Sequence, residues 1–143
     1  MSTSSGIDER EEGLSLQPKF DASGLLTCVA TDAATGEVLM VAHMNEEALR
    51  KTVASGEAWY FSRSRNALWR KGETSGQTQR VVEMRVDCDQ DAVWIRVEQQ
   101  GAACHTGRKS CFYRKVEAGA GDGAKLSFVD ADRLFDPKTV YRT

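Results

Sequence analysis

The sequence has no long apolar run, only two prolines and almost no net charge. No stretch approaches the roughly 18 apolar residues of a membrane-spanning helix, and the polar, acidic residues 1–13 lack the apolar core of a secretory signal. We therefore expect a cytoplasmic protein. The 19 basic and 21 acidic residues give a net charge of −2, whereas proteins that bind nucleic acid are usually clearly basic. These features argue against a nucleic-acid-binding protein and against a membrane-spanning protein.

The length and the ordinary globular composition predict one folded domain. The chain has 143 residues, of which 41% are hydrophobic and 28% charged, and a chain of this size can bury a core without a disulfide or a metal. Residues 1–18 are polar and charged, so we predict a flexible tail there and a single domain over 19–143. Both prolines lie near the ends, which leaves the middle of the chain free to form a continuous sheet.

Hydrophobic periodicity predicts many strands and one clear helix. Asn45 is a good helix N-cap, Glu46 and Glu47 suit the positive end of the helix dipole, and Gly56 marks its end. A short helical turn is expected at 132–135. Alternating or apolar segments predict strands at 25–31, 37–43, 58–62, 67–71, 79–91, 92–98, 112–116 and 125–129. The predicted fold class is α+β, a compact, sheet-rich and mainly antiparallel domain with one or two helices.

The most regular alternation, at 79–91, ends in an acidic run. Val82, Met84 and Val86 share one face of the expected strand, and charged residues share the other. If the segment stays extended, the carboxylates of Asp87, Asp89 and Asp91 project from one side. A divalent cation such as Mg²⁺ would relieve their repulsion through oxygen ligation, whereas a solvated strand end or turn is the alternative.

Three of the four cysteines form a candidate metal set. Cys88, Cys104 and Cys111 contain no C-x-x-C pair, so the pattern is not that of a zinc ribbon. Three thiolates and an open position would still make a catalytic zinc site, although buried free cysteines are also common as small hydrophobic residues. In an extended segment, Cys88 would point away from the neighbouring aspartates. Cys28 lies in an alternating strand and is predicted to be an inert core thiol.

A basic, polar stretch and a histidine complete the candidate site. Residues 63–80 combine five basic side chains with one acidic residue, and such a stretch either contacts phosphate or forms a solvated hairpin. His105 adjoins Cys104 and is the preferred general acid or base, although it could instead bind the metal, and His43 is expected to be structural. The candidate substrate contacts are Arg63, Arg65, Trp69, Lys71, Thr74 and Ser75.

Five ordered motifs resemble the phosphoribosyl-AMP cyclohydrolase family. They cover about residues 25–116, and they are long and correctly spaced. Their sequences are Met44-Asn45-Glu46-Glu47-Ala48-Leu49, Ser62-Arg63-Ser64-Arg65, Leu68-Trp69-Arg70-Lys71-Gly72-Glu73-Thr74-Ser75-Gly76, Asp87-Cys88-Asp89-Gln90-Asp91 and Cys104-His105-Thr106-Gly107-Arg108-Lys109-Ser110-Cys111-Phe112-Tyr113. Only 27 residues follow Val116, too few for the pyrophosphohydrolase domain that some relatives carry, so a monofunctional form is expected.

The resemblance implies an activity, two metals and a dimer. The family opens the adenine ring of 1-(5-phosphoribosyl)-AMP at the N1–C6 bond with a zinc-activated water, and the product is the phosphoribosyl-formimino carboxamide intermediate of L-histidine biosynthesis. By the resemblance, Cys88 of one subunit and Cys104 and Cys111 of the other would hold one zinc per subunit in an obligate homodimer. Asp87, Asp89 and Asp91 would hold magnesium.

Two other functions are alternatives to this interpretation, and the sequence lacks the patterns that each requires. A zinc-dependent nucleoside or nucleobase deaminase requires H-x-E followed by P-C-x-x-C, and neither pattern occurs in the sequence. A zinc-stabilised RNA-binding module would need a basic surface and paired C-x-x-C knuckles, which the net charge and the cysteine spacing do not provide.

Overall fold

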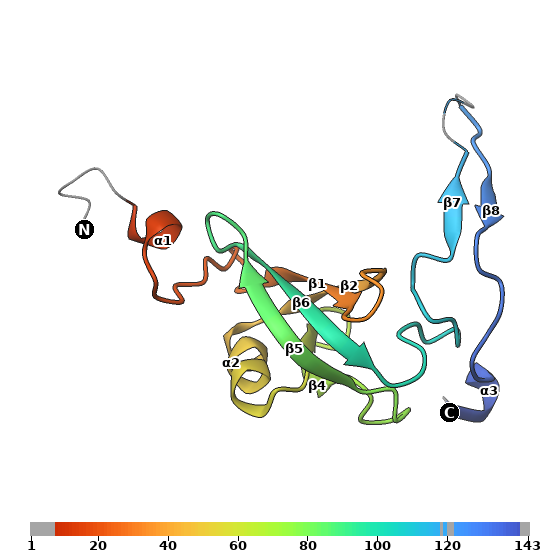
Figure 1. Cartoon of the computed structure of the whole chain (residues 1–143), viewed down its shortest axis with the longest axis horizontal. Helices are drawn as coiled ribbons and strands as arrows, with labels where there is room; N and C mark the ends of the chain where they lie inside the picture. The colour runs from red at the N-terminus through yellow and green to blue at the C-terminus, as the bar shows by residue number, and fades with distance from the viewer. Residues whose placement is uncertain (1–7, 118, 120–121, 141–143) are drawn as a thin grey trace.

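The computed structural model describes residues 8–117, 119 and 122–140. Its centre is a four-stranded sheet in the order β2-β1-β6-β5 (Figure 1). The two hairpin pairs are antiparallel, whereas β1 and β6 pair in parallel. The bounds are β1 Leu26–Asp32, β2 Val38–Met44, β5 Gln79–Val86 and β6 Ala92–Gln99. The predicted α+β class with a mainly antiparallel sheet is confirmed, and the homodimer stays a prediction.

The predicted helix is confirmed at both ends. Helix α2 spans Glu46–Ser55, and the side chain of Asn45 accepts a hydrogen bond of 2.8 Å from the backbone N–H of Ala48. Gly56 closes the helix in the left-handed conformation, with φ of 75°, which glycine adopts without a steric penalty. Ala48, Leu49 and Thr52 form its buried face. The capping residues therefore set the position of α2 from local chemistry.

The core lies between the central sheet, α2 and a second hairpin. That hairpin pairs β3 (Trp59–Ser62) with β4 (Ala67–Arg70). Tyr60 is fully buried and donates a hydrogen bond of 2.6 Å to the side-chain oxygen of Gln79 on β5. Cys28 is also fully buried, and burial raises the pKa of its thiol to about 12. Its predicted place as a core thiol is confirmed.

The alternation in β5 does not continue through the strand as predicted. A β-bulge shifts the register between Val81 and Glu83, because an extra residue in one strand of a pair changes which side chains face the core. Val82 is 49% exposed and Val86 is 40% exposed. Two of the three residues of the predicted apolar face are therefore exposed, whereas the third, Met84, packs against the core.

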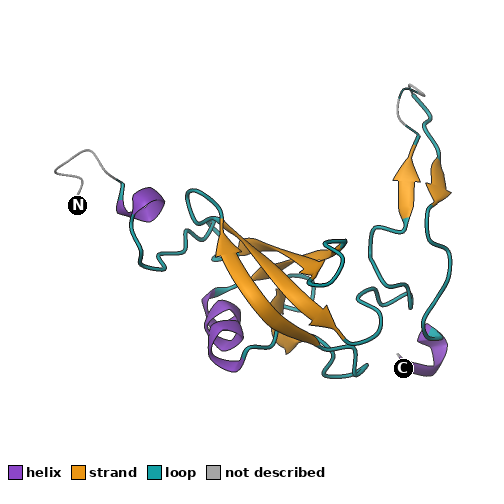
Figure 2. Ribbon diagram, viewed as in Figure 1, coloured by secondary structure: helices purple, strands orange, loops and turns teal. Residues whose placement is uncertain are grey.

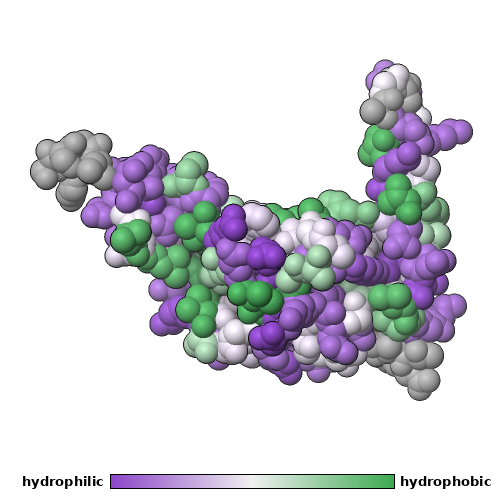
Figure 3. Space-filling model, in the orientation of Figure 1, coloured by the Kyte–Doolittle hydropathy of each residue, from purple (hydrophilic) through white to green (hydrophobic). Residues whose placement is uncertain are grey.

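Two segments project from this body. The N-terminal segment contains α1 (Glu9–Glu12), and a distant hairpin pairs β7 (Arg114–Val116) with β8 (Leu126–Phe128) (Figure 2). Figure 3 shows that polar and apolar side chains both cover the projecting hairpin. The helical turn expected at 132–135 is wrong: the chain turns at α3, Pro137–Val140, and a proline suits the first position of a helix.

The predicted tail lies partly outside the described residues. Residues 1–7 are not described, and residues 8–18 include a helical turn whose N-cap is Asp8. Among the described residues, no helix is both long enough and apolar enough to cross a membrane.

Candidate functional site

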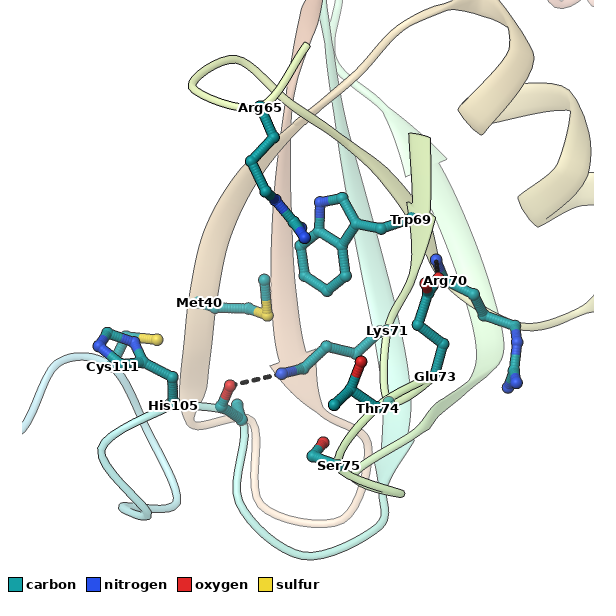
Figure 4. Close-up of a pocket in the computed structure, with 12 residues that line it drawn as sticks. Met40, Arg65, Trp69, Arg70, Lys71, Glu73, Thr74, Ser75, His105 and Cys111 are labelled. Carbon is teal, nitrogen blue, oxygen red and sulfur yellow. Dashed lines mark hydrogen bonds between the residues drawn. The ribbon is translucent and has the colours of Figure 1, made fainter. Parts of the chain in front are cut away.

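A cavity of about 380 Å³ collects most of the predicted site residues (Figure 4). One side of the cavity is formed by β4 and the loop after it, and the other side by the loop after β6. Met40 and Ala103 line it beside the predicted residues. The predicted residues that line it are Arg65, Trp69, Lys71, Thr74, Ser75, His105 and Cys111. Side chains from distant parts of the sequence thus face one space, of a size that suits a small-molecule ligand.

Lys71 connects the two sides of this cavity. Its side chain is buried, and the ammonium group donates a hydrogen bond of 2.6 Å to the carbonyl oxygen of Ala103 (Figure 4). Burial lowers the pKa of Lys71, while Cys111 and Cys104 act in the opposite direction. The positive charge of Lys71 in turn acts against the effect of burial on the pKa of the Cys111 thiol.

The loop after β4 is shaped by glycine. At Gly72, φ is 88°, and a Cβ atom would lie 2.6 Å from the backbone nitrogen of Thr78. The N–H of Gly76 donates a hydrogen bond of 2.8 Å to the carbonyl oxygen of Gly72 and closes the loop. Only glycine fits the first position, and the tight loop brings Thr74 and Ser75 to the cavity wall.

Arg63 lies outside the main cavity. It lines a neighbouring cavity of about 560 Å³ together with His43, whose pKa is lowered by burial and by the charge of Arg63. Arg65 and Trp69 line both cavities. Trp69 packs against Tyr60, with 5.2 Å between the ring centroids. The two cavities are therefore adjacent and share an arginine and an indole.

The loop of residues 104–111 presents two sulfur atoms and an imidazole. Cys104 is buried, and its Sγ accepts a hydrogen bond of 3.1 Å from the hydroxyl of Thr106. Burial, together with the neighbouring Cys104, raises the pKa of the Cys111 thiol to about 12. His105 is exposed and lines the cavity. The structure thus brings together two of the three predicted zinc ligands and the predicted acid or base.

Side chains that the sequence reasoning missed hold this loop to the sheet. The hydroxyl of Ser110 donates a hydrogen bond of 2.7 Å to the carbonyl oxygen of Val38. The ammonium group of Lys109 lies 2.9 Å from a carboxylate oxygen of Asp32 and 3.1 Å from one of Glu37. Both positions lie between the two cysteines, and their polar character was the only signal in the sequence.

Cys88 is not brought to the other two cysteines within one chain. It lies in the turn before β6, whereas Cys104 follows the end of that strand (Figure 1). β6 has 8 residues, and at ~3.3 Å per residue its first and last residues lie about 23 Å apart. All four cysteines are free thiols.

The three aspartates converge through a turn and not through an extended strand. β5 ends at Val86, and Gln90 adopts a left-handed backbone with φ of 59°. This corrects the expected extended geometry and the opposite orientation of Cys88 that depended on it. One oxygen atom from each of Asp87, Asp89 and Asp91 lies within 4.8 Å of the others, and this is the metal-compatible cluster of the described residues.

The proximity of these carboxylates changes their protonation. Asp91 shares hydrogen bonds with Asp87 and Asp89, and these bonds together with the neighbouring negative charges raise the pKa of Asp91 to about 6. Its hydrogen bond to Asp89 lowers the pKa of Asp89. One oxygen of Asp87 also accepts the backbone N–H groups of Asp91 and Ala92 at 3.0 and 3.1 Å. The cluster therefore favours either a shared proton or a cation.

Comparison with known proteins identifies the family. The profile of the family described as phosphoribosyl-AMP cyclohydrolase matches residues 40–113. A protein of Bradyrhizobium diazoefficiens with that name is 86% identical over 134 residues, which are 94% of this chain and 95% of the relative. A second, from Nitrobacter winogradskyi, is 75% identical over 142 residues, 99% and 98% of the two chains. The chain belongs to this family.

Membership in the phosphoribosyl-AMP cyclohydrolase family confirms the resemblance seen in the sequence and makes the chain an enzyme. Every predicted site residue, from Arg63 to Cys111, lies within the matched segment. The relatives named above are cyclohydrolases, so neither the deaminase nor the RNA-binding alternative gains support.

Proposed function

We propose that the chain hydrolyses the N1–C6 bond in the adenine ring of 1-(5-phosphoribosyl)-AMP, a ring-opening step of histidine biosynthesis. The observation that carries this proposal is the cavity of about 380 Å³, in which cationic, aromatic and hydroxyl side chains face His105 and Cys111. The names of the relatives support it. The product would be the phosphoribosyl-formimino carboxamide.

The two adjacent cavities suit a substrate with two phosphate groups. Trp69 lines both cavities, and an indole can stack on a purine. We assign Arg65, Lys71, Thr74 and Ser75 to one phosphoribosyl group in the main cavity, because forked guanidinium, ammonium and hydroxyl donors suit phosphate. Arg63 would contact the other group in the neighbouring cavity. Lys71 retains donors beyond the one that bonds to Ala103.

The paired cysteines fit zinc in the chemistry of their donors. Cys104 and Cys111 are neighbouring thiols, and the adjacent charge of Lys71 acts against the rise in the pKa of Cys111 that burial causes. We propose that they bind one zinc ion per subunit. A zinc ion bound there would lower the pKa of its water toward neutrality.

We propose a homodimer in which Cys88 of the partner subunit completes this zinc site. The separation of Cys88 from Cys104 along β6 supports the proposal, because a single subunit supplies only two of the three thiolates. The exposed Val82 and Val86 lie on β5, directly before Cys88. Apolar side chains exposed beside an incomplete site are typical of a contact between subunits.

We assign magnesium to Asp87, Asp89 and Asp91. Their oxygen atoms lie within 4.8 Å of one another, and hard cations prefer carboxylate oxygens. A cation there would neutralise the repulsion that raises the pKa of Asp91. Its role in the reaction would be to hold or neutralise substrate phosphate.

His105 is assigned the proton transfers. When water adds to C6, it must lose a proton, and when the N1–C6 bond breaks, N1 must gain one. An exposed imidazole at the cavity wall can both accept and donate a proton. C6 then ends as a carboxamide and N1 as an amidine nitrogen.

Turnover of phosphoribosyl-AMP by the purified protein tests the activity. We expect an absorbance change as the purine ring opens, and we expect a zinc chelator to abolish it. Metal analysis should give about one zinc per chain, as a site with three protein ligands implies. A zinc-free protein with full turnover would contradict the metal assignment, and a zinc-loaded protein without turnover would contradict the activity.

Mixing two inactive variants tests the shared site. Cys88→Ser and Cys104→Ser should each lose zinc and activity, whereas Cys28→Ala, which changes a core thiol, should keep both. After subunit exchange, each mixed dimer contains one intact site. Random pairing in a symmetric dimer then restores roughly a quarter of the original activity. No recovery after confirmed exchange would contradict sharing between subunits.

A further inference from the structure

The side chain of Gln90 fixes the N-terminal segment to the acidic turn. Its amide oxygen accepts a hydrogen bond of 2.8 Å from the backbone N–H of Gln17. Its amide nitrogen donates to the carbonyl oxygens of Arg10 and Ser15, at 2.9 and 3.2 Å. The backbone N–H of Lys19 donates a further bond of 2.8 Å to the carbonyl oxygen of Gln90. The hydrogen bonds of this side-chain amide therefore go to backbone atoms of residues 10–17.

The attachment is polar and buried. Gln90 is only 3% exposed, although it lies in a turn, whereas Leu14 and Leu16 of the attached segment are 104% and 50% exposed. Leu14 therefore makes no hydrophobic contribution to holding the segment, and Leu16 is only half-buried. A buried side-chain amide that lost its partners would be left unsatisfied at a substantial cost. Gln90 and residues 10–17 consequently depend on each other.

The same segment lies beside the candidate metal ligands. A cavity of about 410 Å³ is lined on one side by residues from Arg10 to Leu16 and on the other by Asp87, Cys88 and Gln90. Gln90 also holds the left-handed backbone, with φ of 59°, at the centre of the turn. For a residue other than glycine, this conformation needs support from its surroundings. The segment supplies that support through the amide.

We propose that residues 10–17 form a strap that positions the Asp87–Asp91 turn, with Gln90 as the positioning residue. The strap fixes the turn in the form that gathers the three carboxylates. Its value for catalysis depends on the magnesium site proposed above. Its effect on the conformation of the turn does not depend on any metal.

Variants of the full-length chain test whether the contact between the strap and Gln90 fixes the turn. Gln90→Gly removes the amide but tolerates a positive φ. Asn66→Gly is its matched control, because Asn66 is also left-handed, with φ of 50°, and lies in the turn between β3 and β4. Gln17→Pro removes the N–H that bonds to Gln90, while Gln17→Ala keeps it. A double variant with no larger defect than either Gln90→Gly or Gln17→Pro alone would show that both act through the same contact.

The first measurement is amide hydrogen exchange in the metal-free protein. The N–H groups of Asp91 and Ala92 donate to Asp87 and so report the form of the turn. We expect exchange there to be faster by about tenfold in Gln90→Gly and Gln17→Pro, the value of one net hydrogen bond. Neither control should change it. Unchanged exchange in both test variants would overturn the proposal.

The second measurement is Mn²⁺ binding followed by electron paramagnetic resonance. The two test variants should bind Mn²⁺ about 10- to 100-fold more weakly, as expected when a residue that orients metal ligands is lost. Faster exchange with unchanged Mn²⁺ affinity would overturn the positioning role. If Asp89→Asn, made in a chain with the strap and Gln90 intact, does not alter Mn²⁺ binding, the magnesium assignment fails. The exchange result alone then decides whether the strap holds the turn.

Discussion

The ammonium group of Lys71 donates a hydrogen bond of 2.6 Å to the carbonyl oxygen of Ala103, across the candidate cavity. The bond joins the end of β4 to the residue before Cys104. It therefore couples the proposed substrate-binding loop to the proposed zinc loop. The charge of Lys71 also acts on Cys104 and Cys111, so one side chain supports both the packing and the electrostatics of the site.

Lys71→Met should weaken both functions of this side chain. We expect the free energy of unfolding to fall by about 1.5–3 kcal/mol, the range for a hydrogen bond to a charged group. Zinc affinity in a chelator competition should fall about 10- to 100-fold, as for other residues that support metal ligands. Arg80→Met, on an exposed ion pair with Glu98, is the control and should change neither. Wild-type zinc affinity in Lys71→Met would contradict the electrostatic role.

His105→Asn distinguishes an acid or base from a metal ligand. If His105 transfers protons, kcat should fall by about 10²- to 10⁴-fold, while KM and zinc content remain close to those of the unmodified protein. Loss of zinc from this variant would instead make His105 a ligand. The measurement is kcat and KM over a range of pH, combined with metal analysis of the same preparation.

Local chemistry made α2 predictable, whereas long-range pairing did not. Asn45 and Gly56 specify the ends of α2 through interactions within a few residues. The parallel pairing of β1 with β6 and the bulge between Val81 and Glu83 depend on strands that lie far apart in the sequence. An alternating pattern cannot reveal an extra residue, so the exposure of Val82 was not predictable.

In the candidate site, too, the sequence indicated the types of residues but not how they are arranged in space. The types of its residues were evident, because a metal needs thiolates or carboxylates and phosphate needs cations. Their arrangement was not evident: the turn at Gln90 gathers the aspartates, and Lys71 reaches Ala103 only because two loops meet at one end of the sheet. The strap on Gln90 had no signal in the sequence, since its partners are backbone atoms.

Trp69→Ala should weaken substrate binding more than the chemical step. Stacking of a base on an aromatic side chain contributes about 1–3 kcal/mol, so KM should rise about 5- to 150-fold with a smaller change in kcat. Trp69→Phe should retain most of the affinity. Trp94→Ala is the control, because Trp94 is 37% exposed and bonds to Thr31 of the sheet. An unchanged KM for Trp69→Ala would remove Trp69 from the substrate site.

Asp91→Asn should stabilise the metal-free protein, and the gain should depend on pH. The pKa of Asp91 is raised from 3.8 to about 6 in the folded state. Between these values the folded protein binds more protons than the unfolded chain, so the free energy of unfolding falls as the pH rises through this window. Asparagine does not ionise, so the variant should not lose this stability as the pH rises. Its advantage should therefore be small below about pH 4 and complete above about pH 6, the two limits set by linkage.

Without Mg²⁺ the Asp91→Asn variant should be the more stable protein, and with Mg²⁺ the unmodified protein should be the more stable one. A cation that binds only the folded state raises stability by an amount that grows with the logarithm of its concentration divided by its Kd. Asp91→Asn lacks one of the proposed ligands. In urea unfolding at pH 8, the unmodified protein should gain stability as Mg²⁺ is added, whereas the variant should gain little. At pH 4 the gain of the unmodified protein should be smaller, because a proton then occupies Asp91. Equal gains in the two proteins at pH 8 would contradict the assignment of Asp91 as a magnesium ligand.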